Sequence, residues 1–101
     1  MSIQKQVSED GKCLTISIAG RFDISTYKDF GEAYKDHLDS TQKWVLNMSE
    51  VEYLDSSALG MLLMFRERTG GDNAAIDITN CSPGVRKIFD TANFDKLFRI
   101  E

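Results

Sequence analysis

Three consecutive residues, Asp55-Ser56-Ser57, stand between a short apolar run and a second apolar segment of helix-forming composition. Carboxylate and hydroxyl oxygens accept hydrogen bonds from the unpaired N–H groups of a helix's first turn, so the triplet predicts the start of a helix. The same N–H groups, with the positive end of the helix dipole, would also stabilise a phosphoryl group there. The triplet therefore has two compatible roles, a helix cap and a serine phosphorylation site, and we expect the function to depend on Ser56.

The composition limits the classes of function that the triplet can serve. A chain of 101 residues is long enough for one domain, residues 1–101, with a single core. Its net charge of −4 argues against nucleic-acid binding, which requires a basic face. The sequence has neither a signal-peptide pattern nor an apolar run near the ~18 residues of a membrane span. We expect a cytoplasmic domain that binds neither nucleic acid nor membrane.

The two cysteines, Cys13 and Cys81, are isolated in the sequence. Neither belongs to a CxxC pair or accompanies a histidine cluster, so the sequence indicates no metal site, no cofactor and no disulfide framework. We expect buried structural thiols in a reducing compartment. The single histidine, His37, lies in a polar stretch and is expected at the surface.

Apolar periodicity predicts strands that alternate with helices. The expected strands are residues 3–7, 12–19, 43–48, 74–79 and 97–100. The expected helices begin at Ser25 or Thr26, at residues 55–57 and at Ser82-Pro83, and the second of them ends before Gly70-Gly71. The helix after the triplet is expected to bury an apolar stripe and to expose two arginines. The stripe is Met61, Met64 and Phe65 with Leu62 or Leu63, and the arginines are Arg66 and Arg68.

The order of these elements predicts an α/β fold. Asp10-Gly11 is a tight turn that can join only antiparallel neighbours, so the first strand is expected to run against an otherwise mostly parallel sheet. About four helices are expected to cover this sheet. The run at 43–48 is typical of a strand covered on both faces.

Three stretches of the chain resemble the STAS domain, specifically the stand-alone anti-sigma-factor antagonists of bacteria. Residues 20–23 resemble the family's turn after the second strand, residues 48–60 its phosphoacceptor segment, and residues 82–89 the start of its third helix. The spacings agree over nearly the whole chain. One residue departs from the pattern, because Ala58 stands where the family usually has glycine.

The resemblance implies a binding switch and not an enzyme. In the family, the serine that follows the motif aspartate is phosphorylated by an anti-sigma factor, a serine kinase of the histidine-kinase-like ATPase fold. The unphosphorylated form binds that kinase, phosphorylation abolishes the binding, and a PP2C-type phosphatase reverses it. By position the acceptor is Ser56, with Ser57 as the second choice, in a chain expected to be a monomer.

The expected partner surface lies at the start of the helix after the triplet and on the preceding turn. Its residues are Asp23, Asp55, Ser56, Ser57, Ala58 and Gly60, with Arg21, Phe22, Ile24 and Ser25 at its rim.

Several other interpretations remain beside this one. Asp23 is as well explained by capping of a turn as by a role in the site. A serine hydrolase would need the pattern Gly-x-Ser-x-Gly, which is absent, as is a Walker loop. A receiver domain phosphorylated on Asp55 would need further carboxylates to hold a metal ion. A constitutive interaction module, or a switch in a pathway without a sigma factor such as biofilm control, also fits.

Overall fold

One sheet carries the fold, with strands in the spatial order β1-β2-β3-β4-β5. The computed structural model describes residues 3–101, and within them the strands are β1 (Ile3–Val7), β2 (Cys13–Phe22), β3 (Lys43–Leu54), β4 (Ile76–Thr79) and β5 (Arg99–Ile100). The α-helices of these residues are α1 (Tyr27–Tyr34), α2 (Ser56–Arg68) and α3 (Pro83–Thr91). Short 3₁₀ helices lie at Ile24–Thr26, Lys35–His37, Gly71–Asn73 and Phe94–Lys96.

The strands pair as the sequence predicts. β1 runs antiparallel to β2 across a turn in which Gly11 has a φ of 74°, and the remaining neighbours are all parallel. The mostly parallel α/β sheet with an antiparallel first strand is therefore confirmed. Within residues 3–101 it is accompanied by three α-helices and four 3₁₀ turns, where about four helices were expected.

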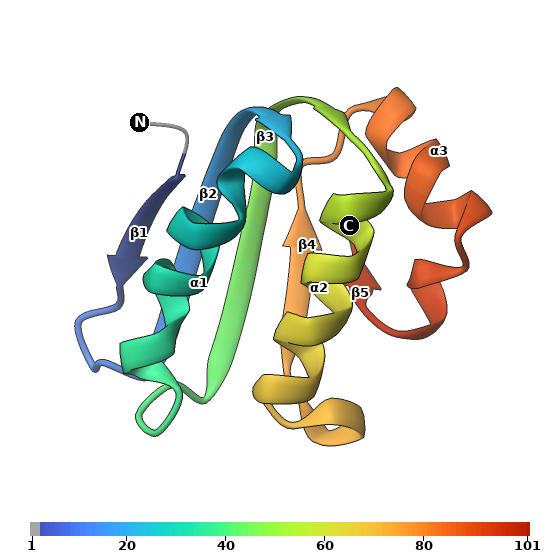
Figure 1. Ribbon diagram of the computed structural model, residues 1–101. Helices are drawn as coiled ribbons and strands as arrows, with labels where there is room; N and C mark the ends of the chain where they lie inside the picture. The colour runs from blue at the N-terminus through green and yellow to red at the C-terminus, as the bar shows by residue number, and fades with distance from the viewer. Residues whose placement is uncertain (1–2) are drawn as a thin grey trace.

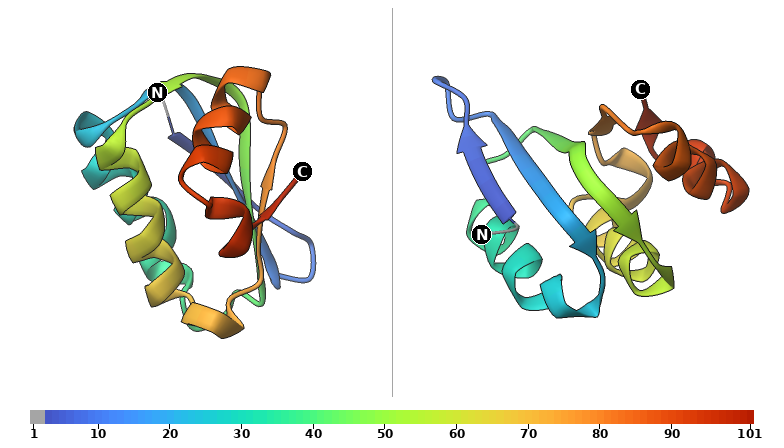
Figure 2. Two further views of the ribbon diagram at one scale, coloured as in Figure 1. Left: turned by 90° about the vertical axis from the view of Figure 1, so that its right-hand side faces the viewer. Right: turned by 90° about the horizontal axis from the view of Figure 1, so that it is seen from above.

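The helices cover only one face of the sheet. Figures 1 and 2 show α1 and α2 side by side on that face and α3 at the β4–β5 end. Along β3, Trp44, Leu46 and Met48 are buried, whereas Val45 and Asn47 between them are half-buried. The expectation of a strand covered on both faces is thus wrong. Each crossover joins adjacent strands in one direction across the sheet, and right-handed crossovers then place their helices on the same side.

An aromatic cluster fills the space between the sheet and the first two helices. The Phe65 ring on α2 lies 5.2 Å from the Trp44 ring on β3 and 4.9 Å from the Tyr34 ring on α1, measured between centroids. Phe30 on α1 lies 5.5 Å from the same ring. Aromatic pairs at these separations stabilise a core beyond their buried area. The cluster therefore fixes α1 and α2 relative to β3, and with them the positions at which both helices begin.

The stripe expected on α2 is buried in part. Met61, Leu62 and Phe65 lie in the core, as predicted. Met64 was expected there too, but 40% of it is exposed, because it lies on the side of α2 that faces away from the sheet. Leu63, its neighbour on that side, is equally exposed.

The end of α2 departs from expectation at one arginine. Arg66 was expected in solvent, yet its Nε donates to the Leu97 carbonyl at 3.1 Å and its Nη2 donates to Asp72 at 2.8 Å. Arg68 is exposed, as predicted. Arg66 thus ties the last turns of α2 to the segment that leads into β5.

Three residues that the sequence singled out for possible chemistry are only half-buried. Cys13 and Cys81 are free thiols. Both were expected to be buried, but each is only half-buried. His37 is half-buried rather than at the surface, and its Nε2 lies 3.0 Å from the Lys5 Nζ. Among the helices of residues 3–101, none combines the length and the apolar character needed to cross a bilayer.

Candidate functional site

The ends of β2 and β3 bring the predicted site residues to one edge of the sheet. These neighbouring parallel strands pair to their last residues, with Arg21 opposite Tyr53 and Phe22 opposite Leu54. The residue that follows each strand is an aspartate, Asp23 or Asp55, and each aspartate begins a helical segment. Because parallel strands end at the same edge, both aspartates follow their strands at one edge of the sheet, and Figure 1 shows β2 and β3 leading there into α1 and α2.

Asp55 supplies the cap of α2. Its backbone is extended, and its Oδ1 accepts the N–H of Ala58 at 3.1 Å. Ser56 follows as the first helical residue and is exposed, while Ser57 is half-buried. Among the described residues the Ser56 hydroxyl has no hydrogen-bond partner. The cap and the candidate acceptor are therefore different residues, and modification of Ser56 would leave the cap in place.

Asp23 performs the equivalent task at the end of β2. Its Oδ1 accepts hydrogen bonds from the Ser25 backbone N–H at 3.0 Å and from the Ser25 hydroxyl, and its carbonyl accepts from the Thr26 hydroxyl at 2.7 Å. The Ser25 hydroxyl is the main cause of a lowered pKa of the Asp23 carboxyl, and Arg21, whose Nε lies 3.6 Å away, lowers the pKa further. A structural role for Asp23 is thus observed, and its carboxylate stays ionised at neutral pH.

One cation and several acids surround this edge. Arg21 lies against the Tyr53 ring at 4.6 Å from its centroid and is also the ion-pair partner of Asp23. Glu50 and Glu52 are exposed on the last half of β3. The edge therefore carries an excess of negative charge before any modification.

Exposed apolar side chains lie on the same edge. Ile24 is 65% exposed, Tyr27 49% and Tyr53 44%. Ile24 was predicted at the rim of the partner surface and is exposed there, as are Arg21, Ser25 and Gly60. Tyr27 and Tyr53 are further candidates that the sequence analysis did not include. Tyr53 could have been found from the sequence, because it lies two residues before the triplet and directly before the buried Leu54, so its side chain points to the opposite face of the strand.

Two predicted surface residues lie in the core instead. Phe22 and Ala58 are each 0% exposed, so their side chains cannot contact a partner. Phe22 points under the helices because it is the strand neighbour of the exposed Arg21, and alternate side chains of a strand face opposite ways. Ala58 occupies an ordinary position within α2, where alanine suits a helix better than glycine does.

Two grooves open beside α2. The groove between α2 and α3 has a volume of about 370 Å³ and is lined by Leu59, Ile88 and Ala92 among others. The groove between α1 and α2 has a volume of about 280 Å³ and is lined by Tyr27, Met64 and their neighbours. Residues of α2 line both grooves, Leu59 in the first and Met61, Met64 and Arg68 in the second.

The chain is similar in sequence and in fold to known proteins. The family model described as "Mlab, STAS domain" matches residues 5–99. A STAS-domain containing protein of Pseudomonas aeruginosa (strain UCBPP-PA14) is 48% identical over 100 residues, which are 99% of each chain.

Solved structures with the same fold include anti-sigma-factor antagonists. One from Mycobacterium paratuberculosis superposes with a TM-score of 0.80 at 25% identity, over 98% of this chain and 85% of that one. The anti-sigma factor antagonist SpoIIAA in its unphosphorylated form gives a TM-score of 0.81 at 17% identity, over 98% of this chain and 87% of that one.

Proposed function

This chain belongs to the STAS-domain family, and we propose from that premise that it is a protein-binding switch controlled by phosphorylation of Ser56. The observation that carries the proposal is the exposed Ser56 hydroxyl at the first turn of α2, beside a cap that Asp55 already supplies. The chain acts in this proposal as a binding module and not as an enzyme. The proposed partner surface around the acceptor consists of Asp23, Asp55, Ser57, Gly60, Arg21, Ile24 and Ser25.

The charges at the sheet edge support such a switch. Phosphorylation adds about −1.5 to −2 charges at neutral pH. The helix dipole stabilises this charge by roughly 0.3–1 kcal/mol. Repulsion from Asp23, Asp55 and the glutamates of β3 opposes that effect. Because the two effects largely cancel, we expect the fold to stay as it is.

A partner that fits against the neutral serine would meet the new charge inside the interface. An uncompensated buried charge costs several kcal/mol, on the order of 3–5 kcal/mol. A loss of ~3 kcal/mol already weakens binding more than a hundredfold. Phosphorylation at Ser56 can therefore release a partner without a conformational change in this chain.

The partners proposed are a serine kinase of the histidine-kinase-like ATPase fold, which the unphosphorylated form binds, and a PP2C-type phosphatase that restores this form. SpoIIAA, whose fold the chain shares, has been determined in an unphosphorylated and in a phosphorylated form, which supports a phosphorylated state in this fold. The output is proposed to be release of a sigma factor, with control of a different pathway as the alternative.

The first test is phosphopeptide mass spectrometry of the protein recovered from its native cells. Trypsin cleaves after Lys43 and Arg66, so one peptide contains Ser49, Ser56 and Ser57, and fragment ions distinguish the three. We expect phosphate on Ser56, its loss in Ser56→Ala, and its retention in Ser57→Ala. A phosphate lost under mild alkali would instead be an acyl phosphate on Asp55.

The binding test uses the kinase that copurifies with the chain. Ser56→Asp should bind it at least a hundredfold more weakly than wild type, and Ser57→Ala should bind it normally. An unmodified Ser56 under several growth conditions, together with equal binding by Ser56→Asp, would contradict the switch and favour a constitutive interaction module.

A further inference from the structure

The groove between α1 and α2 shares Tyr27 with the surface around Ser56 and extends beyond it to Met64 and Arg68. Apolar and charged side chains line it together, and Tyr27 and Met64, one from each helix, are 49% and 40% exposed. Gly31 on α1 widens the groove, since a Cβ built there meets no atom within 4 Å. We infer that this groove is a second docking site, which binds an amphipathic helix of a protein partner whose apolar face is flanked by acidic residues.

Tyr34 adds to the lining of the groove a hydroxyl that no described residue pairs with. Tyr34 is 3% exposed and packs against Trp44 and Phe65, yet it also lines the groove. Its hydroxyl has no hydrogen-bond partner among residues 3–101, where no fully enclosed side-chain oxygen is left without one. The hydroxyl must therefore open onto the groove. Burial raises its pKa, so it stays protonated and can donate to a ligand.

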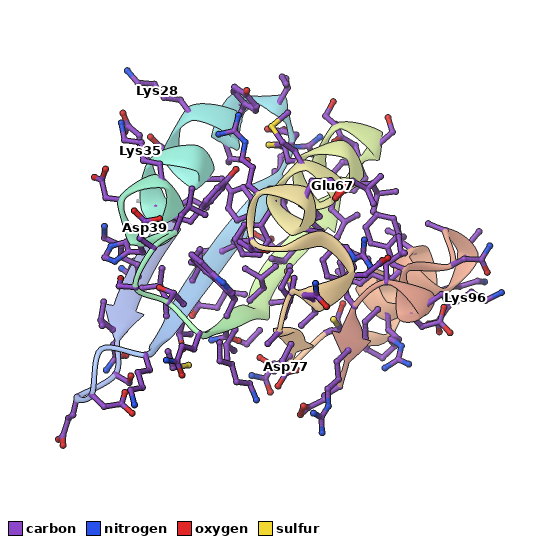
Figure 3. The ribbon with its side chains drawn as sticks, turned by 90° about the horizontal axis from the view of Figure 1, so that it is seen from below. Lys28, Lys35, Asp39, Glu67, Asp77 and Lys96 are labelled. Carbon is purple, nitrogen blue, oxygen red and sulfur yellow. The ribbon has the colours of Figure 1, made fainter. Side chains whose placement is uncertain are left out.

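The charges around the groove select for an acidic partner. Lys28, Lys35 and Arg68 line it, against the single carboxylate of Glu32. This local excess of two positive charges stands out in a chain whose net charge is −4. Figure 3 shows Lys28 and Lys35 on the same side of the molecule, where Lys28 lies on α1 and Lys35 directly follows it, and Lys96 at the opposite end of the molecule. Complementary charge of this kind steers association and excludes partners of like charge.

The shape of the groove favours a helix over a small molecule. It is a partly open trough lined by two helices and not an enclosed cavity, whereas pockets for small molecules bury most of the ligand's surface. An apolar groove between helices is the form that receives an amphipathic helix, and methionine side chains adapt to such a partner.

The Met64 end of the groove lies farther from the phosphorylation site than the Tyr27 end does, although Ser56 and Met64 are both on α2. Met64 follows Ser56 by eight residues, which is about 12 Å along a helix axis. The Debye length at physiological ionic strength is about 8 Å, so charge at Ser56 is largely screened at Met64. A partner whose contacts centre on the Met64 and Arg68 end of the groove can therefore remain bound whichever state Ser56 is in.

The experiment uses a synthetic helical peptide with leucines at positions i, i+3, i+4 and i+7 and glutamates on both flanks, titrated into the isotopically labelled chain. We expect amide shifts at the groove, and at least tenfold weaker binding by the counterpart peptide with lysine in place of glutamate. Gly31→Leu, which fills the groove, should weaken binding at least tenfold, and so should Lys28→Glu combined with Lys35→Glu.

Matched controls separate this site from the rest of the surface. Gly84→Leu adds the same side chain to α3 in equally open space, and Lys96→Glu reverses a lysine far from the groove. Both should change the affinity less than twofold, and so should Ser56→Asp, whose own effect on the kinase tests the proposed function separately. Equal binding of both peptides, or an unchanged affinity of Gly31→Leu, would overturn the inference. A concentration-dependent dimer that Gly31→Leu dissociates would overturn it in favour of a second copy of the chain.

Discussion

Asp55 accepts the Ala58 N–H, and Ser56 next to it presents a hydroxyl to solvent. A side-chain cap satisfies one of the unpaired donors at a helix start, and at α2 Asp55 supplies that cap. The same arrangement recurs at Asp23, where the carboxylate holds both polar groups of Ser25. Ser25 is therefore engaged, whereas Ser56 is available for modification, although both serines follow an aspartate closely.

Substitutions at this helix start should distinguish the cap from the acceptor. Asp55→Ala should lower the free energy of unfolding by about 1 kcal/mol, because a capping hydrogen bond is lost. Ser56→Ala should change it by less than about 0.5 kcal/mol, as expected for an exposed residue. Urea denaturation of both variants measures the difference, with Asp55→Asn as a control that keeps a capping oxygen. An equal loss in Ser56→Ala would mean that Ser56 also serves as a cap.

At the scale of the element, the starts and stops of helices were predictable because local chemistry sets them. Ser82 caps α3 with proline at the first position, and α2 ends before Gly70, whose φ is 130°. The end of β3 was not predictable in the same way. Residues 49–54 mix polar and apolar side chains without strict alternation. The pairing of β2 with β3 contains register shifts, and these shifts account for the lack of alternation.

The residues of the candidate site also divide into those that local chemistry predicts and those whose burial depends on the tertiary fold. The cap at the start of α2 was predicted from the sequence because capping preferences are local, and Asp55 supplies it, whereas Ser56 as the acceptor stays a prediction from the family resemblance. The burial of Phe22 and the exposure of Tyr27 and Met64 depend on which face of the sheet the helices cover. That choice follows from strand order across the whole chain, which residue patterns do not encode.

The hydrogen bonds that Arg66 makes at the end of α2 predict how much this helix end contributes to stability. Arg66→Ala should lower the free energy of unfolding by roughly 1–2 kcal/mol, because a hydrogen bond from a charged, half-buried donor to the Leu97 carbonyl is lost. Asp72 is almost fully exposed, so Asp72→Ala should cost less than about 0.5 kcal/mol although it removes the other partner of Arg66. Thermal or urea unfolding measures both. Equal costs would show that the ion pair, and not the carbonyl contact, holds the helix.

At the scale of the whole molecule, one contiguous core connects the sheet to all three α-helices of residues 3–101. Ser56 lies outside this core, while Leu54 and Ala58 on either side of it are buried. The modifiable hydroxyl is thus held in place by rigid neighbours and makes no contribution to the packing. A change of charge there alters the surface potential of the domain far more than its structure.

We therefore expect Ser56→Asp to leave the fold unchanged and to alter the electrostatic potential at the edge of the sheet where β2 and β3 end. Its free energy of unfolding should differ from that of wild type by less than about 1 kcal/mol, since dipole stabilisation and repulsion from neighbouring acids oppose each other. Added salt should shrink whatever difference remains, because both effects act between exposed charges. Amide chemical shifts should change near Asp23, Asp55 and the first turn of α2, and not around Phe89 or in β1. Shifts that reach those distant residues would mean that the charge acts by moving elements of the fold, and an interface blocked by local charge would then no longer explain the release of a partner.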